Sequence, residues 1–393
     1  MCSVMIPTHR LRQAHIPGYS GLQDVVVAAG VITAIQPSAS PIQGDRASDP
    51  SSLDLAGDWL SLGGVDLQIN GALGLPFPDL TPENADKLTA INQFLWQQGV
   101  DAYLPTIVTA SVEQIQRSLS VIAAHQSAAP VAGHAAILGA HLEGPCLNPD
   151  KRGAHPQEHL QPLTIAHLQT ILGDHAAAVQ VMTLAPELDP TGEVIPYLRS
   201  QGITVSLGHS LATAAQATAA FEQGARMVTH AFNAMPPLHH RQPGLLAAAI
   251  VHPQVACGFI ADGQHIDPLM LDVLLRAAGY EQGLFLVSDA LSPLGLPDGV
   301  YPWDTRQIEV KQGTARLPDG TLSGTTLGLL VGVQNLVQWG ICSVAQAIAL
   351  ATVAPRRAIG LPTDWIGQPA HLLRWHLTGD RRLTWSRLSL PSD

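Results

Sequence analysis

The chain has 393 residues, of which 46% are hydrophobic and 13% are charged, and its formal net charge is −11. The hydrophobic fraction excludes a disordered chain, and an acidic balance without a basic run excludes a nucleic-acid surface. Apolar runs stop short of the roughly 18 residues that a membrane helix needs, so we expect no membrane span. The four cysteines show no CxxC pair and we find no signal peptide, which favours a cytoplasmic protein.

Both ends of the chain have the alternating pattern of short strands. Residues 25–35 contain two β-type runs around Gly30 and predict a hairpin, and the Pro- and Ser-rich stretch 37–52 predicts an exposed loop. Near the other end, residues 370–378 and 382–385 alternate in the same way. We therefore predict a small β domain formed by both ends, beside a barrel. The predicted limits are 1–58 and 361–393 for the small domain and 59–360 for the barrel.

Between the two ends, short apolar runs alternate with helical patterns. The runs that have the length of buried strands are 62–68, 101–108, 136–141, 179–184, 203–208, 226–230, 255–261 and 284–288. The clearest helical patterns are 84–98, 112–125, 164–172, 211–224 and 268–278. Eight such alternations favour a (β/α)8 barrel, with a doubly wound open sheet as the alternative.

The alternation weakens after residue 293. Residues 295–320 are rich in Gly, Pro and Asp and predict a loop with short β pieces around 307–310. Residues 327–339 and 343–353 return to a helical pattern, so this loop separates the eighth strand from the last helices.

Polar residues stand at the carboxyl ends of four predicted strands. Glu143 follows the third strand. His209 and His230 follow the fifth and the sixth, and Asp289 follows the eighth. In a barrel these ends meet at the rim where active sites form. Two imidazoles and a carboxylate could bind a metal ion and leave one coordination position open for water, as in catalytic zinc sites. Asp289 could then transfer a proton. For each residue alone, the alternative is a hydrogen-bonded histidine or a helix cap.

Other residues are expected on the same rim. His155 could polarise a carbonyl and Arg241 could bind a phosphate, and a solvated loop residue is the alternative for both. Further rim residues are Asn233, Ala234, His265 and Ser323.

These rim segments form an ordered set of short motifs. They are Gly64-Val-Asp-Leu-Gln-Ile-Asn-Gly71, His141-Leu-Glu-Gly-Pro145, Lys151-Arg-Gly-Ala-His155, Gly208-His-Ser210, Thr229-His-Ala-Phe-Asn-Ala-Met-Pro236, Arg241-Gln-Pro-Gly244, Ala261-Asp-Gly-Gln-His265, Val287-Ser-Asp-Ala290, Ser323-Gly-Thr-Thr326 and Ala351-Thr-Val-Ala-Pro355. The set resembles the N-acetylglucosamine-6-phosphate deacetylase family of the amidohydrolase superfamily. Each motif alone is weak, but the ordered set is specific.

The resemblance implies a barrel with a small β-sandwich domain. It implies hydrolysis of the acetamide of N-acetyl-D-glucosamine 6-phosphate, which gives D-glucosamine 6-phosphate and acetate. Glu143, His209 and His230 would bind one divalent metal ion per subunit, with zinc expected before Fe²⁺, Co²⁺ or Mn²⁺. Asp289 would accept and donate the proton. Positions that match the family's substrate contacts are Ala154, His155, Asn233, Ala234, Arg241, Asp262, Gly263, Gln264, His265, Leu322, Ser323 and Gly324.

The family is commonly dimeric, so the resemblance implies a homodimer in which Arg241 reaches the neighbouring active site.

Many amidohydrolases carry His-x-His after the first strand, where this chain has Gln68 and Asn70. Because amides are weak ligands for transition metals, we expect a single-metal enzyme in which Gln68 hydrogen-bonds the catalytic water or orients a ligand.

Two other functions are compatible with parts of this pattern. A deaminase or cyclic-amide hydrolase would share the metal and the aspartate, but Arg241 and the Asn233-Ala234 segment argue against it. A non-catalytic sugar-phosphate sensor would share the fold, but it would not need a proton-transfer group such as Asp289.

Overall fold

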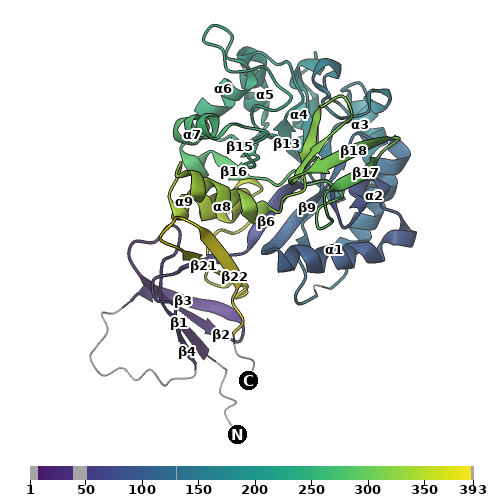
Figure 1. The fold of residues 1–393 in the computed structure, drawn as a ribbon. Coiled ribbons are helices and arrows are strands. Elements are labelled where there is room, and N and C mark those ends of the chain that lie inside the picture. The colour runs from purple at the N-terminus through teal and green to yellow at the C-terminus, as the bar shows by residue number, and fades with distance from the viewer. Residues whose placement is uncertain (1–7, 39–50, 130, 391–393) are drawn as a thin grey trace, which may run out of the picture.

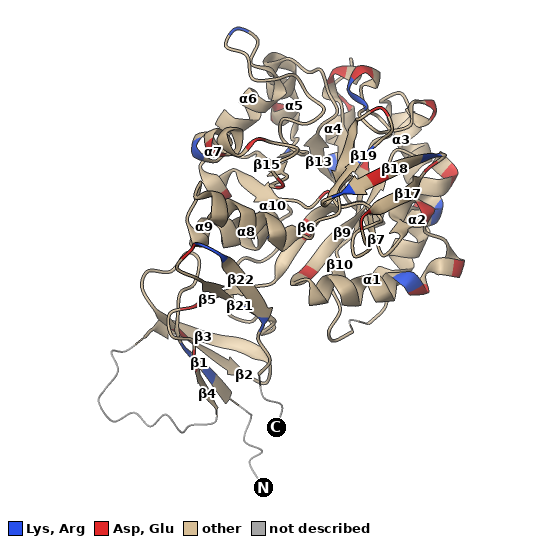
Figure 2. Cartoon of the chain, in the orientation of Figure 1, with Lys and Arg blue, Asp and Glu red and all other residues tan. Residues whose placement is uncertain are grey.

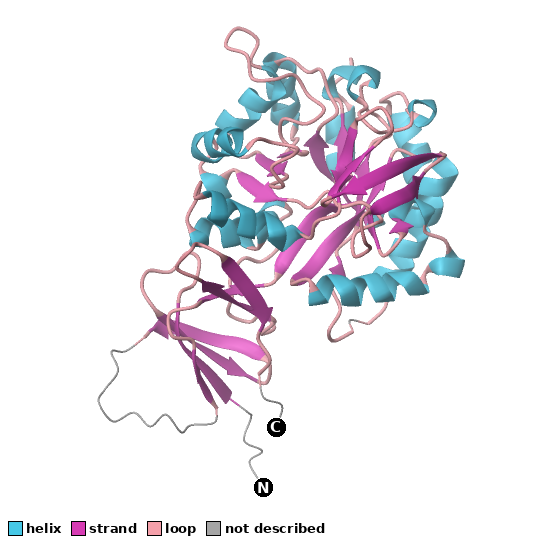
Figure 3. Ribbon diagram, in the orientation of Figure 1, coloured by secondary structure: helices cyan, strands magenta, loops and turns pink. Residues whose placement is uncertain are grey.

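The computed structural model describes residues 8–38, 51–129 and 131–390. Helices surround a ring of strands in the larger part of the molecule, and a smaller, strand-rich part holds both chain ends (Figure 1). Figure 3 shows that the helices lie on the outside of this ring. In the described residues, no helix has the length and apolar character needed to cross a membrane.

The ring in the described chain consists of eight parallel strands. In order they are β6 (Gly64–Ile69), β9 (Val100–Val108), β11 (Ala140–Glu143), β12 (Val179–Leu184), β13 (Thr204–Leu207), β14 (Met227–Val228), β15 (Ala256–Phe259) and β16 (Leu284–Leu286). The ring closes just after β16 through a parallel bridge between Ile69 and Ala290. There the N–H of Asp289 also donates to the carbonyl of Gln68 at 2.9 Å. The predicted barrel is therefore confirmed over the open sheet.

Apolar strands and capped helices explain why this sequence forms a barrel. Four of the six residues of β12, Val-Gln-Val-Met-Thr-Leu, are apolar and five are buried, as expected for a strand covered on both faces. Ser111, Thr213 and Ser343 each form a capping box at the start of a helix. The helices are α1 (Asp86–Gln97), α2 (Val112–Gln126), α3 (Ile165–Leu172), α4 (Val194–Ser200), α5 (Ala214–Gln223), α6 (Gly244–Val251), α7 (Pro268–Ala277), α8 (Leu329–Trp339), α9 (Val344–Ala351) and α10 (Val353–Ala358).

The smaller part combines strands from both ends of the chain. One sheet has the order β3 (Val31–Pro37), β2 (Gln23–Ala28), β1 (Thr8–Ala14) and β4 (Ser52–Asp54). A second sheet has the order β22 (Leu383–Arg387), β21 (Leu372–Leu377) and β5 (Trp59–Leu62). Leu11, Leu62 and Leu372 share one apolar core, so residues more than 300 positions apart pack together. The predicted domain limits at residues 58 and 360 stay a prediction.

The predicted hairpin around Gly30 is present as β2 and β3. Gly30 has a φ of +74°, a conformation that glycine adopts without steric cost. The loop predicted for 37–52 lies mostly outside the described residues.

The segment expected to be a loop after residue 293 contains an antiparallel sheet. Its strands are β17 (Gly299–Trp303), β18 (Arg306–Lys311), β19 (Thr314–Arg316) and β20 (Leu322–Thr325). The expected β pieces around 307–310 belong to β18, but the prediction missed a sheet of four strands. Leu291, Trp303 and Ile308 form an apolar core beneath it, and this buried face holds the Gly- and Pro-rich segment in strands. Smaller strands elsewhere are β7 (Gly71–Ala72), β8 (Leu75–Pro76) and β10 (Ala136–Ile137).

Charged residues are sparse on this fold. Figure 2 shows blue and red residues scattered over the outer helices and the loops. Several acidic residues lie instead near the carboxyl ends of the barrel strands, where Glu143 and Asp289 are buried.

Candidate active site

Four polar side chains project from the carboxyl ends of barrel strands into one region. Glu143 is the last residue of β11. His209, His230 and Asp289 follow β13, β14 and β16, and their φ angles are +48°, +27° and +47°. Positive φ is uncommon outside glycine and clusters at functional sites. The chain thus turns sharply after each of these three strands and aims the side chain into the barrel mouth.

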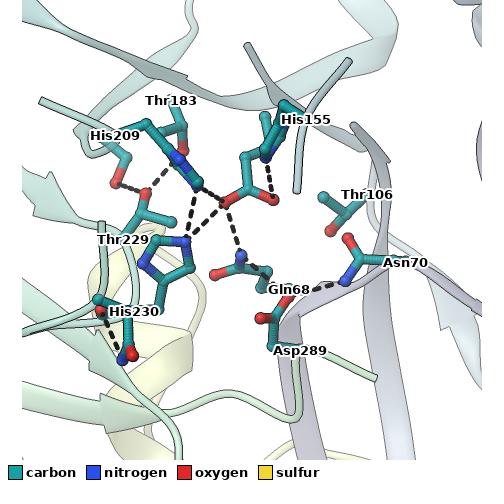
Figure 4. A network of polar contacts seen from close by, with 12 residues as sticks. Gln68, Asn70, Thr106, His155, Thr183, His209, Thr229, His230 and Asp289 are labelled. Carbon is teal, nitrogen blue, oxygen red and sulfur yellow. Dashed lines mark hydrogen bonds and ion pairs between the residues drawn. The ribbon is translucent and has the colours of Figure 1, made fainter. Parts of the chain in front are cut away.

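Three ligand-type atoms converge at the centre of this region. Nε2 of His230 lies 3.0 Å from Oε1 of Glu143 and 3.0 Å from Nε2 of His209. Nε2 of His209 lies 3.3 Å from the same carboxylate oxygen. Figure 4 shows the imidazoles of His209 and His230 pointing toward one another. All three residues are buried.

The protonation of His209 shows what this cluster can bind. Nδ1 of His209 lies 2.8 Å from the carbonyl oxygen of Lys151, which only accepts, so Nδ1 carries the hydrogen and Nε2 presents a lone pair. Burial alone would raise the pKa of Glu143, but the two adjacent imidazoles hold it well below its usual value, so this residue is an anion. The lone pair of His209 and the carboxylate of Glu143 point to the same place, where they could bind a cation. Two imidazoles and a carboxylate are also a ligand set of catalytic zinc sites.

His155 lies beside this cluster but differs from its members. Glu143, His155 and His209 each offer a ligand-type atom within 4.8 Å of the others. However, the backbone N–H of Thr109 donates to Nδ1 of His155 at 3.3 Å, so the hydrogen of the ring resides on Nε2. Nε2 is 3.9 Å from Oε2 of Glu143. Burial, followed by the proximity of His209, lowers the pKa of His155 to about 3. His155 is therefore a neutral N–H donor, and His230 is the better third ligand.

Asp289 is held by two side-chain amides. Its Oδ1 accepts from Nδ2 of Asn70 at 2.7 Å and from Nε2 of Gln68 at 3.2 Å. Gln68 also donates from Nε2 to Glu143 at 2.9 Å. Within the described residues, no hydrogen bond reaches the other oxygen, Oδ2. Burial, followed by the charge of Glu143, raises the pKa of Asp289 to about 6, which suits a group that exchanges protons near neutrality.

A cavity of about 620 Å³ opens over these residues. The expected site residues that line it are Glu143, Ala154, His155, His209, His230, Asn233, Ala234, His265, Asp289, Leu322, Ser323 and Gly324. Gln68 lies beneath the site, in contact with Glu143 and Asp289.

The other expected residues do not line this cavity. Asp262 accepts from Nδ1 of His265 at 2.7 Å and so orients that ring, and Gly263 and Gln264 complete the same turn. Arg241 is exposed on the loop before α6.

Two contributors to the site were missed by the sequence analysis. Thr109, which sets the tautomer of His155, directly follows the strand predicted at 101–108, so the strand-end rule could have found it. Trp303 lines the cavity from the sheet after residue 293, and no sequence signal places it there.

The fold is similar to that of a solved amidohydrolase, with a TM-score of 0.55 and 13% identity over 95% of this chain and 93% of that one. No family model matches this chain. The chain is 34% identical over 352 residues to the N-acetylglucosamine-6-phosphate deacetylase of Vibrio furnissii, with 89% of this chain and 85% of the relative covered. It is 33% identical over 358 residues to an N-acetylgalactosamine-6-phosphate deacetylase of Escherichia coli O157:H7, with 90% of each covered.

A solved structure gives the same result. The Mycobacterium smegmatis N-acetyl-D-glucosamine-6-phosphate deacetylase, as a variant in complex with N-acetyl-D-glucosamine-6-phosphate, matches with a TM-score of 0.82 and 28% identity. The match covers 96% of this chain and 97% of that one. The chain belongs to the N-acetylglucosamine-6-phosphate deacetylase family, as the motifs indicated.

Proposed function

We propose that the protein hydrolyses the acetamide of N-acetyl-D-glucosamine 6-phosphate to D-glucosamine 6-phosphate and acetate. Its relative from Vibrio furnissii carries that name, and the Mycobacterium smegmatis structure was solved with that sugar phosphate. The observation that carries the proposal is that Glu143, His209 and His230 converge in the same cavity that Asp289 lines. The relative from Escherichia coli makes the galactosamine epimer a second candidate substrate.

A substrate panel tests the proposal. The purified protein is given the 6-phosphates of N-acetylglucosamine and N-acetylgalactosamine, free N-acetylglucosamine and a cyclic amide, and acetate, ammonia and ring opening are measured. We expect acetate from the phosphorylated acetamides, with the glucosamine epimer preferred. Ammonia or ring opening without acetate would support the deaminase or cyclic-amide hydrolase instead, and binding without any product would support the sensor.

Each side chain has a chemical task in this reaction. Glu143, His209 and His230 would hold one divalent ion, zinc first among the candidates, which supplies Lewis acidity and an activated water. Asp289 takes a proton from the attacking water through Oδ2 and returns it to the departing nitrogen. The Nε2–H of His155 donates to the oxygen of the acetamide as negative charge develops on it.

Replacement of His155 tests this role against a role as a metal ligand. We expect His155→Leu to lower kcat by about 10²- to 10³-fold because one donor to the developing oxyanion is lost. Metal content should stay at the wild-type value, measured by elemental analysis beside activity. A loss of the metal together with activity would show that His155 is a ligand.

The metal count is a separate prediction. The amide nitrogens of Gln68 and Asn70 donate to Glu143 and Asp289, and amide nitrogens do not ligate transition metals. We therefore expect one equivalent of metal per subunit at full activity, measured by titration of the metal-free protein. Activity that continues to rise up to two equivalents would contradict this prediction.

We also propose a homodimer in which Arg241 reaches the phosphate in the neighbouring active site. Arg241 is exposed and absent from the cavity of its own chain. Apolar side chains are exposed on α6 and α7, with Val251 80% and Leu269 71% exposed. Exposed apolar residues of this kind favour a contact with a second copy.

Arg241→Ala is expected to raise KM for the phosphorylated substrate by about 10- to 100-fold, because a charge-assisted contact is lost, and to change KM for free N-acetylglucosamine little. Coexpression of Arg241→Ala and Asp289→Asn subunits tests whether the arginine acts across the interface. A mixed dimer contains one site with an intact Asp289 and the partner's intact arginine, so activity should exceed that of either variant alone. No recovery in verified mixed dimers would place Arg241 in its own site.

A cytoplasmic location remains part of the proposal. Cys146, Cys257 and Cys342 are free and buried, which suits a reducing compartment.

A further inference from the structure

Asn70 has one end of its side-chain amide satisfied and the other end free. It follows β6 directly, is 2% exposed and lines the same cavity as Asp289. Its Nδ2 donates to Oδ1 of Asp289 at 2.7 Å. Its Oδ1 is buried and has no hydrogen-bond partner among the described residues. A buried carbonyl without a partner is costly, so this oxygen is suited to a donor that arrives with a ligand.

The orientation of this amide is fixed by its neighbours. An ionised Asp289 can only accept, so the nitrogen of Asn70 must face it and the oxygen must point away from it. The backbone is held on both sides, because the N–H of Asn70 donates to Ala290 at 2.7 Å and its carbonyl accepts from Phe77 at 2.9 Å. Figure 4 shows Asn70 and Gln68 on either side of Asp289. The free oxygen therefore has one defined position beside the proton-transfer group.

We propose that Oδ1 of Asn70 accepts the N–H of the substrate's acetamide and thereby orients the nitrogen for protonation by Asp289. This proposal rests on the proposed deacetylation. The acetamide nitrogen carries one hydrogen, which needs an acceptor once the substrate is buried. Asp289 must reach the same nitrogen to protonate it. Asn70 lies against Asp289, so its free oxygen is placed to receive that hydrogen.

The role of Asn70 follows from the course of the reaction. Water forms a bond to the carbonyl carbon and gives one proton to Asp289. The C–N bond then breaks, its electron pair stays on nitrogen, and nitrogen takes the proton from Asp289. The products are the amine and acetic acid, which ionises to acetate. As the carbonyl carbon becomes tetrahedral, nitrogen gains a lone pair. An N–H held by Asn70 leaves that lone pair facing the proton on Asp289.

Asn70 could orient the acetamide nitrogen, or it could only support Asp289. An ester substrate distinguishes these two roles, because it has no N–H for Asn70 to bind. We compare kcat/KM for N-acetylglucosamine 6-phosphate with kcat/KM for 2-O-acetylglucose 6-phosphate, which has the same leaving position but no hydrogen on the bridging atom. Asn70→Leu is expected to lower the amide-to-ester ratio by about 10- to 100-fold, because only the amide loses a hydrogen bond. Asn70→Ala serves in the same comparison if the leucine variant does not fold.

Gln68→Leu is the matched control, because Gln68 also donates to Oδ1 of Asp289. Gln68→Leu should lower kcat/KM for both the amide and the ester, and the amide-to-ester ratio should stay within about twofold of the wild-type ratio. If the Asn70 variants lower both rates alike, Asn70 only supports Asp289 or the attacking water, and the proposal is wrong. Failure of the wild-type protein to release acetate from either phosphorylated acetamide would refute the proposed function instead, and that result is seen before any variant is made.

Discussion

Asp289→Asn should give a folded protein that binds its metal ion and has lost nearly all turnover. Asparagine has almost the same shape as aspartate, and its side-chain oxygen can still accept from Asn70 and Gln68. It cannot take a proton from water and return it to nitrogen. We expect kcat to fall by about 10³-fold or more, at the upper end of what general acid–base groups contribute. KM should change little.

The comparison needs evidence that only the proton transfer was lost. Metal content and the circular dichroism spectrum of Asp289→Asn should match those of the wild type. Gln68→Leu is a useful companion, because it removes a contact to Asp289 and leaves the carboxylate in place, so its loss of kcat should be far smaller. Substantial turnover by Asp289→Asn would show that another group moves the proton.

Glu143→Gln is expected to have the second large effect, through the metal. The substitution keeps the size of the side chain and removes its negative charge, which is the only negative charge among the three converging ligands. Loss of a partner that merely orients a ligand costs about 10- to 100-fold in metal affinity, so loss of a charged ligand should exceed 100-fold. Activity should disappear at stoichiometric metal and return in part at high metal concentration.

Metal affinity is measured by competition with a chelator. His155→Leu is the matched control from the same buried cluster, because it should lose turnover and keep its affinity for metal. An unchanged affinity in Glu143→Gln would place the metal elsewhere or give the third ligand to another residue.

The barrel strands were largely predictable, because strands buried on both faces require continuous apolar runs. The run at 179–184 coincides with β12. By contrast, the run at 226–230 yields only Met227–Val228 as strand, since the chain turns toward positive φ at His230. The run at 136–141 is divided between β10 and β11.

The convergence of four strand-end residues was predictable, but the positions of their protons were not. Strand ends brought Glu143, His209, His230 and Asp289 together, as expected from the barrel. The tautomer of His209 depends on a carbonyl 58 residues away, and that of His155 on an N–H 46 residues away. These contacts come from loops, whose path is not indicated by any periodic pattern in the sequence. The structure was therefore needed to distinguish His209, a candidate metal ligand, from His155, a hydrogen-bond donor.

Metal-dependent hydrolysis of a phosphorylated acetamido sugar in this cavity can be measured directly. The most direct measurement is acetate release from N-acetylglucosamine 6-phosphate by the purified protein, before chelation, after chelation and after one equivalent of zinc is restored. We expect release that stops on chelation and returns with zinc. Undiminished release from a protein shown to be metal-free, or no release from the metal-loaded protein, would contradict the account.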